Sequence, residues 1–417
     1  MSSNKTTAVA GDLRVPEPDL TPQEAIARAV AMRPVLRENR VNAAEEGAYS
    51  KELHEAFDEA GFYRLVQPRK YGGYEFGLET YYRVMVEISR GDPGIGWCLT
   101  LGTGHTIPLV AHFSEEVVRE AFGEDGLFIS PHSASPKGIA TPTDGGYRIS
   151  GQWPYSSGVT HSTHALVSTV FISDAGEPVP IAALLPRGDY VIRDDWGAHV
   201  TMALGASGSN TVVLDDVFVP FERTSPLFEW SYSTLEEGTF GTRSTGNPLY
   251  LGQIQPLYPA SLATVQVGAA KAALDAFEET IRTKKRLYPP LVERYLHTDA
   301  QSVYGEARAI SDSAEAVLLT AARDYERLGA RWAAGDTPSF EDWVALGNML
   351  YHACRLAHEA TELVFRSVGS SVSRKGVALQ DYFLTTQMSK AQVAEHIPAI
   401  QLSTARAHFG IEINEIT

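Results

Sequence analysis

Cysteine is scarce in this sequence, whose 417 residues include only Cys98 and Cys354. The two lie far apart, without Cys-x-x-Cys spacing and without a cluster of histidines nearby. Disulfide frameworks and cysteine-type zinc sites both require such groupings. The sequence therefore predicts two buried thiols in a reducing compartment and no metal site.

Long apolar runs and an excess of positive charge are absent as well. No apolar run approaches the ~20 residues that a membrane-spanning helix requires, and residues 1–19 lack the pattern of a signal peptide. The chain has 51 acidic against 35 basic residues, and its formal charge of −16 repels phosphate groups at long range. We expect a cytoplasmic protein with neither a membrane partner nor a nucleic-acid partner.

The most informative stretch runs from residue 145 to residue 220. It opens with GGYRISGQWPYSSG and closes with ASGSNTVVLDDVFVP. Between these strings, segments 165–172 and 181–185 are short and rich in β-branched or apolar residues, with glycine, proline or aspartate around them. Such segments are typical of antiparallel strands. The sequence predicts a β-domain set inside a helical protein.

Helical periodicity dominates on both sides of this β-domain. Thr21 is a candidate N-cap with Pro22 at the first helical position. Further helices are expected at 49–61, 78–90, 94–102 and 115–122. A Gly-, Thr- and Pro-rich stretch at 237–259 predicts a long loop. After it, four long amphipathic segments predict an antiparallel bundle, at 260–285, 301–334, 340–369 and 378–408.

The expected fold class is therefore α+β, with several domains. The predicted parts are a flexible N-terminus (1–19), an N-terminal α-helical domain (20–127), a central antiparallel β-domain (128–230) and a C-terminal four-helix bundle with its leading loop (231–417).

This order of parts, together with four strings of residues, resembles the acyl-CoA dehydrogenase superfamily. The strings are GGYRISGQWPYSSGVTHSTHALV, His105 followed by AHFSEE at 111–116, ASGSNTVVLDDVFVP, and VGAAKAALDAF. The first is similar to the flavin-binding segment of the superfamily's oxygenase branch. That branch consists of two-component, reduced-flavin-dependent monooxygenases of the hydroxyphenylacetate hydroxylase type.

The resemblance implies an activity, a cofactor and partners. A separate flavin reductase would supply reduced flavin, FMNH2 or FADH2, and O2 would add to it as a C4a-hydroperoxide. The distal oxygen would pass to a small substrate, aromatic or otherwise bulky and hydrophobic. The absence of a Gly-x-Gly-x-x-Gly fingerprint fits an enzyme that does not bind NADH itself. The superfamily also implies a homotetramer assembled through the bundle.

The catalytic base distinguishes oxygenase from dehydrogenase in this superfamily. A dehydrogenase needs a carboxylate at the flavin to take the proton α to a thioester. The last long helix has no Glu-Gly-Thr, and the alternative position on the first bundle helix is Tyr258. The Arg-x-Gln-Phe-Gly pattern that grips the flavin pyrophosphate is replaced by residues 286–290, RLYPP. These absences favour oxygenation.

The candidate flavin site lies at the edge of the β-domain. An isoalloxazine ring needs a flat wall and a few hydrogen-bond donors, and the WPYSSG string supplies both through Trp153, Tyr155, Ser156 and Ser157. The resemblance adds further cofactor-binding candidates, although plain turn or cap roles stay open for several of them: Ser130, Ser207, Ser209 and, from a neighbouring subunit, Gly369 and Ser370.

The catalytic candidates are His105, Ser157 and His396. A hydroxyl or a histidine near the reacting edge of the flavin can hold the oxygen adduct and exclude water, and a histidine can deprotonate a phenol. His396 is the nearest match to the histidine that the oxygenase branch carries in its last helix, and it lies about one turn too far along.

The sequence also departs from the family at two arginine positions. Gly205 occupies one, and Leu384 with Thr385 occupies an Arg-Asp pair. Two alternatives therefore remain: a dehydrogenase-like flavoenzyme with a displaced base, for which Glu395 is available, and a non-catalytic relative. Aromatic residues in or near the long loop are candidates for a substrate wall: Trp230, Phe240, Tyr250 and Tyr258.

Overall fold

The computed structural model describes residues 13–227, 230 and 235–411. Residues 1–12 of the expected flexible N-terminus lie outside this range. Leu13 forms a bridge with Tyr71, and its backbone N–H donates to the Lys70 carbonyl at 2.9 Å. The chain is therefore anchored on the N-terminal helical part before its first helix begins.

Among the described residues, six α-helices precede the sheet, and the first begins with the signal that the sequence predicted. The Thr21 hydroxyl accepts a hydrogen bond from the Glu24 backbone N–H at 3.2 Å, and the Glu24 carboxylate accepts one from the Thr21 N–H at 2.9 Å. This capping box, with Pro22 behind it, starts the first helix where the sequence predicted. The helices are α1 (Pro22–Glu46), α2 (Lys51–Glu59), α3 (Leu78–Gly91), α4 (Pro93–Gly104), α5 (Thr106–His112) and α6 (Glu115–Phe122).

The described strands form one mixed sheet, in the order β6-β7-β3-β2-β4-β5-β8, with β1 added beside β4. Most neighbours are antiparallel as predicted, but β4 pairs in parallel with both β1 and β2. The strands are β1 (His132–Ser133), β2 (Ile139–Thr143), β3 (Gly146–Trp153), β4 (His164–Ile172), β5 (Pro178–Pro186), β6 (Val191–Ile192), β7 (Val212–Pro220) and β8 (Thr224–Pro226).

The bundle follows, with two differences from the prediction. The expected loop 237–259 contains a short helix, and the first bundle helix already begins at Ile254 and runs through Pro256 and Pro259. Pro256 falls in its first turn, where a missing N–H costs little. The last predicted helix is broken at 393–395, with Pro398 in the first turn after the break. The helices are α8 (Phe240–Thr245), α9 (Ile254–Thr283), α10 (Thr298–Ala333), α11 (Phe340–Val368), α12 (Ala378–Gln392) and α13 (His396–Phe409).

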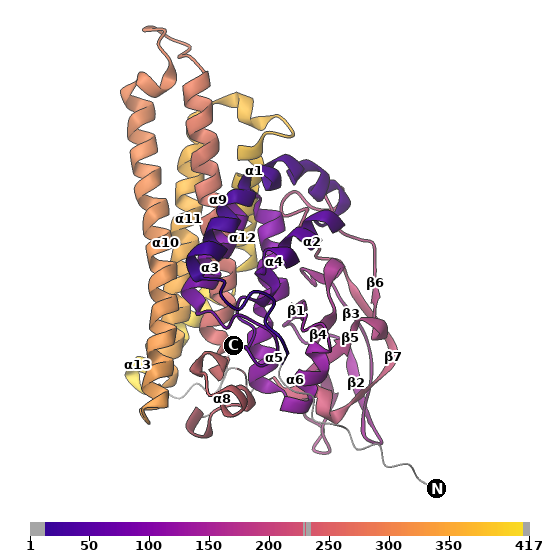
Figure 1. The fold of residues 1–417 in the computed structure, drawn as a ribbon. Coiled ribbons are helices and arrows are strands. Elements are labelled where there is room, and N and C mark those ends of the chain that lie inside the picture. Colours follow the sequence, from indigo (N-terminus) through magenta and orange to yellow (C-terminus); the bar gives the residue numbers. More distant parts are fainter. Residues whose placement is uncertain (1–12, 228–229, 231–234, 412–417) are drawn as a thin grey trace.

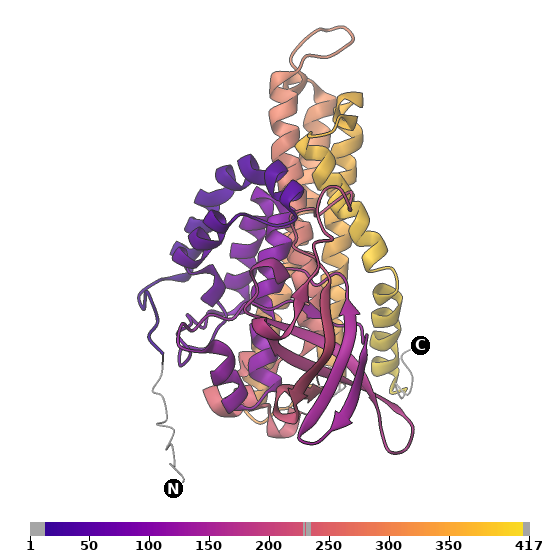
Figure 2. The ribbon, with the colours of Figure 1, turned by 90° about the vertical axis from the view of Figure 1, so that its right-hand side faces the viewer.

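Three layers result. Figure 1 shows the bundle on one side, the N-terminal helices in the middle and the sheet on the other side, and Figure 2 looks onto the sheet. One continuous apolar core joins α1 and α3 to α9, α10 and α11, whereas the sheet has a smaller core of its own. No described helix combines the length and the apolar character needed to cross a bilayer. The α+β architecture is confirmed.

Candidate functional site

Helix α4 connects the parts of the candidate site. Asp92 caps it by accepting a hydrogen bond from the Ile95 N–H at 2.8 Å, and ten of its twelve residues are buried. A helix that is apolar all round is buried all round. Over a length of roughly 18 Å, α4 runs between α3, α9 and the loops at one end of the sheet, and it ends at His105.

Three buried serines meet beside α4. Ser157 Oγ lies 2.8 Å from Ser209 Oγ, which lies 2.6 Å from Ser207 Oγ. Trp97 of α4 donates its Nε1–H to Ser157 Oγ at 2.9 Å. We call Ser157, Ser207 and Ser209 the serine cluster. The structure thus brings together the WPYSSG string and the ASGSN string, whose serines Ser157 and Ser209 are 52 residues apart in the sequence.

Glycine is required where these two strings approach α4. Gly158 has φ +84°, and a Cβ there would lie 2.8 Å from the Cys98 carbonyl oxygen. Gly208 has φ +57°, and its Cβ would lie 2.9 Å from Thr160 Oγ1. The Gly158 N–H donates to the Ser207 carbonyl at 3.0 Å. The glycines of the SSG and SGS sequences therefore permit the close packing that assembles the serine cluster.

The four candidates of the WPYSSG string have different environments. Trp153 is fully buried in the core of the sheet and donates to the Ser168 carbonyl at 2.7 Å. Ser156 is also buried, and its hydroxyl donates back to the Trp153 carbonyl at 2.9 Å. Tyr155 has φ +60° and is 69% exposed, with its ring edge-on to Trp196 at 5.8 Å. Of the two aromatic candidates, Tyr155 is therefore open to solvent and Trp153 packs in the core of the sheet.

His105, at the end of α4, is buried and has a defined tautomer. Its Nδ1 lies 2.7 Å from the Ser130 carbonyl oxygen, which only accepts hydrogen bonds, so Nδ1 carries the proton and Nε2 carries the lone pair. Burial lowers the pKa of His105 to about 4. The ring is therefore neutral at pH 7, with Nε2 able to accept a proton. The Ser130 hydroxyl is engaged with Pro131 and Leu166.

Aromatic and histidine side chains surround His105. His132 Nδ1 is hydrogen-bonded to the Tyr258 hydroxyl, and its Nε2 lies 3.1 Å from Ser168 Oγ. Both rings stand edge-on to His105, at 5.6 and 5.9 Å. Trp230 packs against His132, and it also stacks on His112 at 4.8 Å. We call His105, His112, His132, Trp230 and Tyr258 the histidine cluster.

Two members of the histidine cluster were missed as site residues. His112 lies in the AHFSEE string, which supported the family resemblance without a role for this residue. His132 lies in none of the strings, and only its sequence proximity to Ser130 could have drawn attention to it. Burial lowers the pKa of His112 to about 4 and that of His132 well below its usual value, and it raises the pKa of the Tyr258 phenol. Among the described residues, no group of three or more His, Cys, Asp or Glu is placed to hold a metal ion.

The remaining candidates lie elsewhere. His396 is exposed at the start of α13, where its Nδ1 lies 3.2 Å from the Gln392 carbonyl oxygen, and Figure 1 shows α13 on the side of the bundle away from the sheet. Glu395 is exposed beside it. Gly369 and Ser370 are exposed at the end of α11. Within one subunit the structure brings none of these residues to His105 or to the serine cluster.

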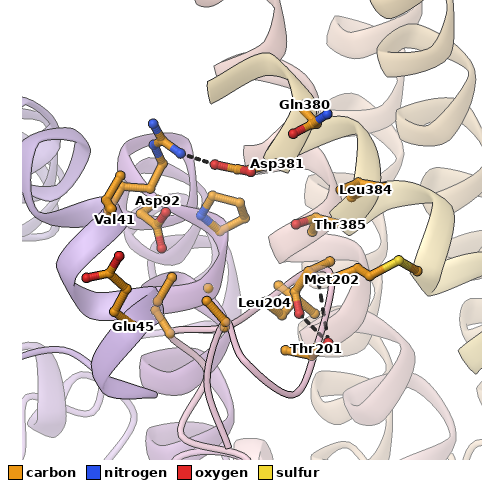
Figure 3. Close-up of a pocket in the computed structure, with 18 of the residues that line it drawn as sticks. Val41, Glu45, Asp92, Thr201, Met202, Leu204, Gln380, Asp381, Leu384 and Thr385 are labelled. Carbon is orange, nitrogen blue, oxygen red and sulfur yellow. Dashed lines mark hydrogen bonds and ion pairs between the residues drawn. The ribbon is translucent and has the colours of Figure 1, made fainter. Parts of the chain in front are cut away.

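A cavity of about 470 Å³ lies near the other end of α4, between α1, the loop 198–206 and α12. Figure 3 shows Asp92, Leu204, Leu384 and Thr385 facing one another across it. Both positions at which the family resemblance places an arginine, Gly205 and Leu384, line this cavity. A Cβ at Gly205 would lie only 3.0 Å from the Ala44 Cβ of α1. Helix α1 therefore leaves little room for a side chain at position 205.

Two family models match the chain. The model described as "Acyl-CoA dehydrogenase, N-terminal domain" matches residues 23–125, and the model described as "Acyl-CoA dehydrogenase, C-terminal domain" matches residues 260–383. The first match covers the helices before the sheet. The second covers α9, α10, α11 and part of α12.

Similar proteins span nearly the whole chain. A pigment production hydroxylase from a Rhodococcus species is 30% identical over 367 residues, which are 88% of this chain and 91% of the relative. The oxygenase subunit HsaA of a flavin-dependent monooxygenase from Rhodococcus jostii is 28% identical over 392 residues, 93% of this chain and 99% of the relative. The crystal structure of 3-HSA hydroxylase from Rhodococcus sp. RHA1 superposes with a TM-score of 0.83 at 26% identity, covering 94% and 98% of the two chains.

Proposed function

Because the chain belongs to the acyl-CoA dehydrogenase superfamily, in its branch of two-component flavin-dependent monooxygenases, we propose that it hydroxylates a small aromatic substrate. It is an oxidoreductase whose partners are a flavin reductase and a small molecule. The cofactor is reduced flavin, FMNH2 or FADH2, and O2 is the co-substrate. The observation that carries the proposal is the neutral His105, whose free Nε2 lies among aromatic side chains.

The residues at the edge of the sheet fit a flavin. Tyr155 offers an exposed aromatic face, and the serine cluster beside it supplies hydroxyl donors. A bound reduced flavin would supply the electrons that activate O2. Tyr155 would stack on the ring, and Ser157, held in place by Trp97 and Ser209, would donate a hydrogen bond to the ring edge. The buried surroundings exclude water and strengthen these hydrogen bonds.

His105 would act on the substrate. Its Nε2 lone pair would accept the proton of an aromatic hydroxyl, which makes the ring carbon ortho to that hydroxyl more electron-rich. Because the Ser130 carbonyl holds the proton on Nδ1, the lone pair of the neutral ring lies on Nε2, on the side of the ring away from Ser130. Tyr258 and Trp230 would provide the aromatic wall of the substrate site, in keeping with their edge and stacking contacts in the histidine cluster.

The assembly and the location are further parts of the proposal. We propose a homotetramer, in which Gly369 and Ser370 from one subunit reach the cofactor of another. Their position at an exposed end of the bundle supports this role. We also propose a cytoplasmic location, which the two buried free thiols Cys98 and Cys354 support.

The test is a stopped-flow reaction of the purified protein. Anaerobically reduced FMN or FADH2 is premixed with the protein, then mixed with oxygenated buffer and a panel of phenols. We expect flavin re-oxidation to be slower than in free solution and hydroxylated product to form from at least one phenol. If re-oxidation followed the same course with and without protein, and no product formed, the monooxygenase proposal would be wrong.

The variant Ser157→Ala is tested in the same stopped-flow assay. Loss of one hydroxyl that holds the flavin is expected to cost about 1 kcal/mol of binding and to raise the hydrogen peroxide formed per flavin oxidised. Ser162→Ala is the matched control, because Ser162 is another buried serine but hydrogen-bonds to Val159 and Tyr190 inside the β-domain. If the two variants formed the same amount of hydrogen peroxide per flavin oxidised, a flavin role for Ser157 would be contradicted.

A further inference from the structure

The histidine cluster has an accessible side as well as buried contacts. His105 and Trp230 are buried, whereas His112, His132 and Tyr258 keep part of their surface accessible. The five side chains come from the two ends of α5, from β1, from α9 and from the segment after β8. Separate elements thus bring polar and aromatic rings to one partly open place, which is where the proposed substrate would lie.

The hydrogen-bond partners of this cluster are uncharged. Those of His105 and His132 are a backbone carbonyl, a phenol and a serine hydroxyl. His112 Nε2 lies 3.2 Å from the Gly252 carbonyl oxygen, and Trp230 donates its Nε1–H to a serine hydroxyl at 2.9 Å. None of these partners brings a positive charge to the cluster.

Burial, and not a neighbouring ion, sets the protonation of these rings. It is the main cause that lowers the pKa values of His105, His112 and His132, and the other causes are backbone carbonyls and the neighbouring His105 ring. Burial alone raises the pKa of the Tyr258 phenol. The four rings are therefore neutral at pH 7. Residues 228–229 and 231–234, on either side of Trp230 in the sequence, add no lysine or arginine.

A carboxylate on the substrate would therefore enter this cluster without a counter-charge. A buried ion is costly unless it is paired. The cluster could supply a cation only by protonating a histidine, and with a pKa of about 4 for His112 roughly one ring in 1,000 is protonated at pH 7. An uncharged phenol meets no such cost, and the aromatic side chains bury its apolar body.

We infer that the substrate is a phenol whose other substituents are uncharged, and that the histidine cluster discriminates against phenols that carry a carboxylate. The inference rests on the proposed hydroxylation and adds the chemical class of the substrate to it. The phenol hydroxyl is then the only ionisable group that the substrate brings. Its proton passes to His105 Nε2, so the charges form as a pair and the site gains no net charge.

The experiment compares two phenols that differ only in charge, 4-hydroxyphenylacetamide and 4-hydroxyphenylacetate. The full-length protein is premixed with anaerobically reduced flavin, then mixed with oxygenated buffer at pH 7 and a range of phenol concentrations. We expect the apparent second-order rate constant of product formation to be at least about 100-fold higher for the amide, because only the carboxylate needs a cation that the cluster lacks.

The variant His112→Arg adds a permanent positive charge to the cluster. A guanidinium can stack on Trp230 as the imidazole does, and it can still donate to the Gly252 carbonyl. We expect it to reduce the preference for the amide at least about 10-fold. His352→Arg is the control, because His352 is an exposed histidine on α11 outside the cluster, and it should keep the wild-type preference.

The outcomes separate this inference from the function on which it rests. If the wild-type protein hydroxylated the carboxylate as fast as the amide, the inference would be wrong and the proposed hydroxylation would stand. A folded His112→Arg protein with the full wild-type preference would also overturn the inference. Product from neither phenol, with flavin re-oxidised as in free solution, would overturn the proposed hydroxylation and this inference with it.

Discussion

At His105, one hydrogen bond to a backbone carbonyl determines which nitrogen can take a proton. The Ser130 carbonyl accepts from Nδ1–H, and the ring is buried, so a neutral imidazole with a free Nε2 is present at neutral pH. Asparagine can still donate to that carbonyl but has no group in the place of Nε2. This difference allows the proton-accepting role to be separated from the structural role.

We expect His105→Asn to fold and to lose about 10²–10⁴-fold in hydroxylation rate, the usual contribution of a general base. The measurement is the rate of product formation in a single turnover, over a range of pH. His358→Asn is the matched control, since His358 is also a buried histidine with a pKa near 4, but it lies on α11 beside Lys390. A wild-type rate of hydroxylation in His105→Asn would rule out His105 as the general base.

Buried neutral histidines also make the stability depend on pH. Burial lowers the pKa values of His105, His112, His164 and His358 to about 4. Between about pH 6.5 and pH 4 the unfolded chain binds protons at these rings and the folded chain does not, so the free energy of unfolding falls as the pH falls. Asp92 has the opposite effect, because its pKa is raised from 3.8 to about 6. Between these pH values the folded protein binds a proton at Asp92 that the unfolded chain does not, so this group adds stability as the pH falls.

Each of these four histidines is expected to cost about 2 kcal/mol of stability between about pH 8 and pH 5. Urea unfolding at both pH values checks this. His358→Asn should show a pH dependence that is smaller by about that amount. Equal stability of the wild-type protein at the two pH values would contradict the burial of neutral histidines.

At the scale of elements, the approach of α9 to α3 depends on a glycine. A Cβ at Gly268 would lie 2.3 Å from the Ser89 Cβ and 2.8 Å from the Val86 carbonyl oxygen. Because backbone and a short side chain cannot move aside independently, the two helices would have to separate. These helices carry the core that joins the N-terminal part to the bundle.

We expect Gly268→Ala to lower the free energy of unfolding by about 1–3 kcal/mol, the usual cost of overpacking. Gly305→Ala on α10 is the control, since nothing lies within 4 Å of its added Cβ, and it should stabilise the protein by about 0.5–1 kcal/mol through helix propensity. Urea unfolding of both variants measures the difference. The explanation fails if the two substitutions shift the midpoint in the same direction.

At the scale of the whole molecule, the end of the bundle exposes apolar side chains. Leu287, Tyr288 and Leu291, in the connection between α9 and α10, are 90%, 74% and 62% exposed. Lys284 Nζ donates to Ser371 Oγ at 2.7 Å, so this connection contacts the segment after Gly369. A subunit interface here would cover the apolar groups and carry Gly369 and Ser370 to a neighbouring subunit.

We therefore expect light scattering to give about four times the chain mass of 45.4 kDa. Leu287→Ser combined with Tyr288→Ser should produce smaller species, while Leu402→Ser, which changes an exposed leucine on α13, should leave the tetramer intact. A monomeric wild-type protein would contradict the assembly. A tetramer unaffected by the double substitution would place the interface elsewhere.

Membership of the acyl-CoA dehydrogenase superfamily and the α+β architecture were both predictable from the sequence. Capping residues such as Thr21 act over one helical turn, and the strings around Ser157 and Ser207 are continuous in the chain, so local patterns identify them. The break between α12 and α13 was missed, although Pro398 inside the predicted segment 378–408 is a local signal for it, because proline in a helix interior removes a backbone hydrogen bond.

The sequence by itself determined the order of the helices, the position of the sheet and the family. Only the tertiary structure decided the environments of the side chains. The positive φ of Tyr155 turns its ring outward while Trp153 packs inward, and His132 meets Tyr258 across 126 residues of sequence. Contacts of that kind depend on how separate elements pack, and no local periodicity encodes them. The cavity beside Asp92 depends on such packing too, because residues from four separate segments enclose it.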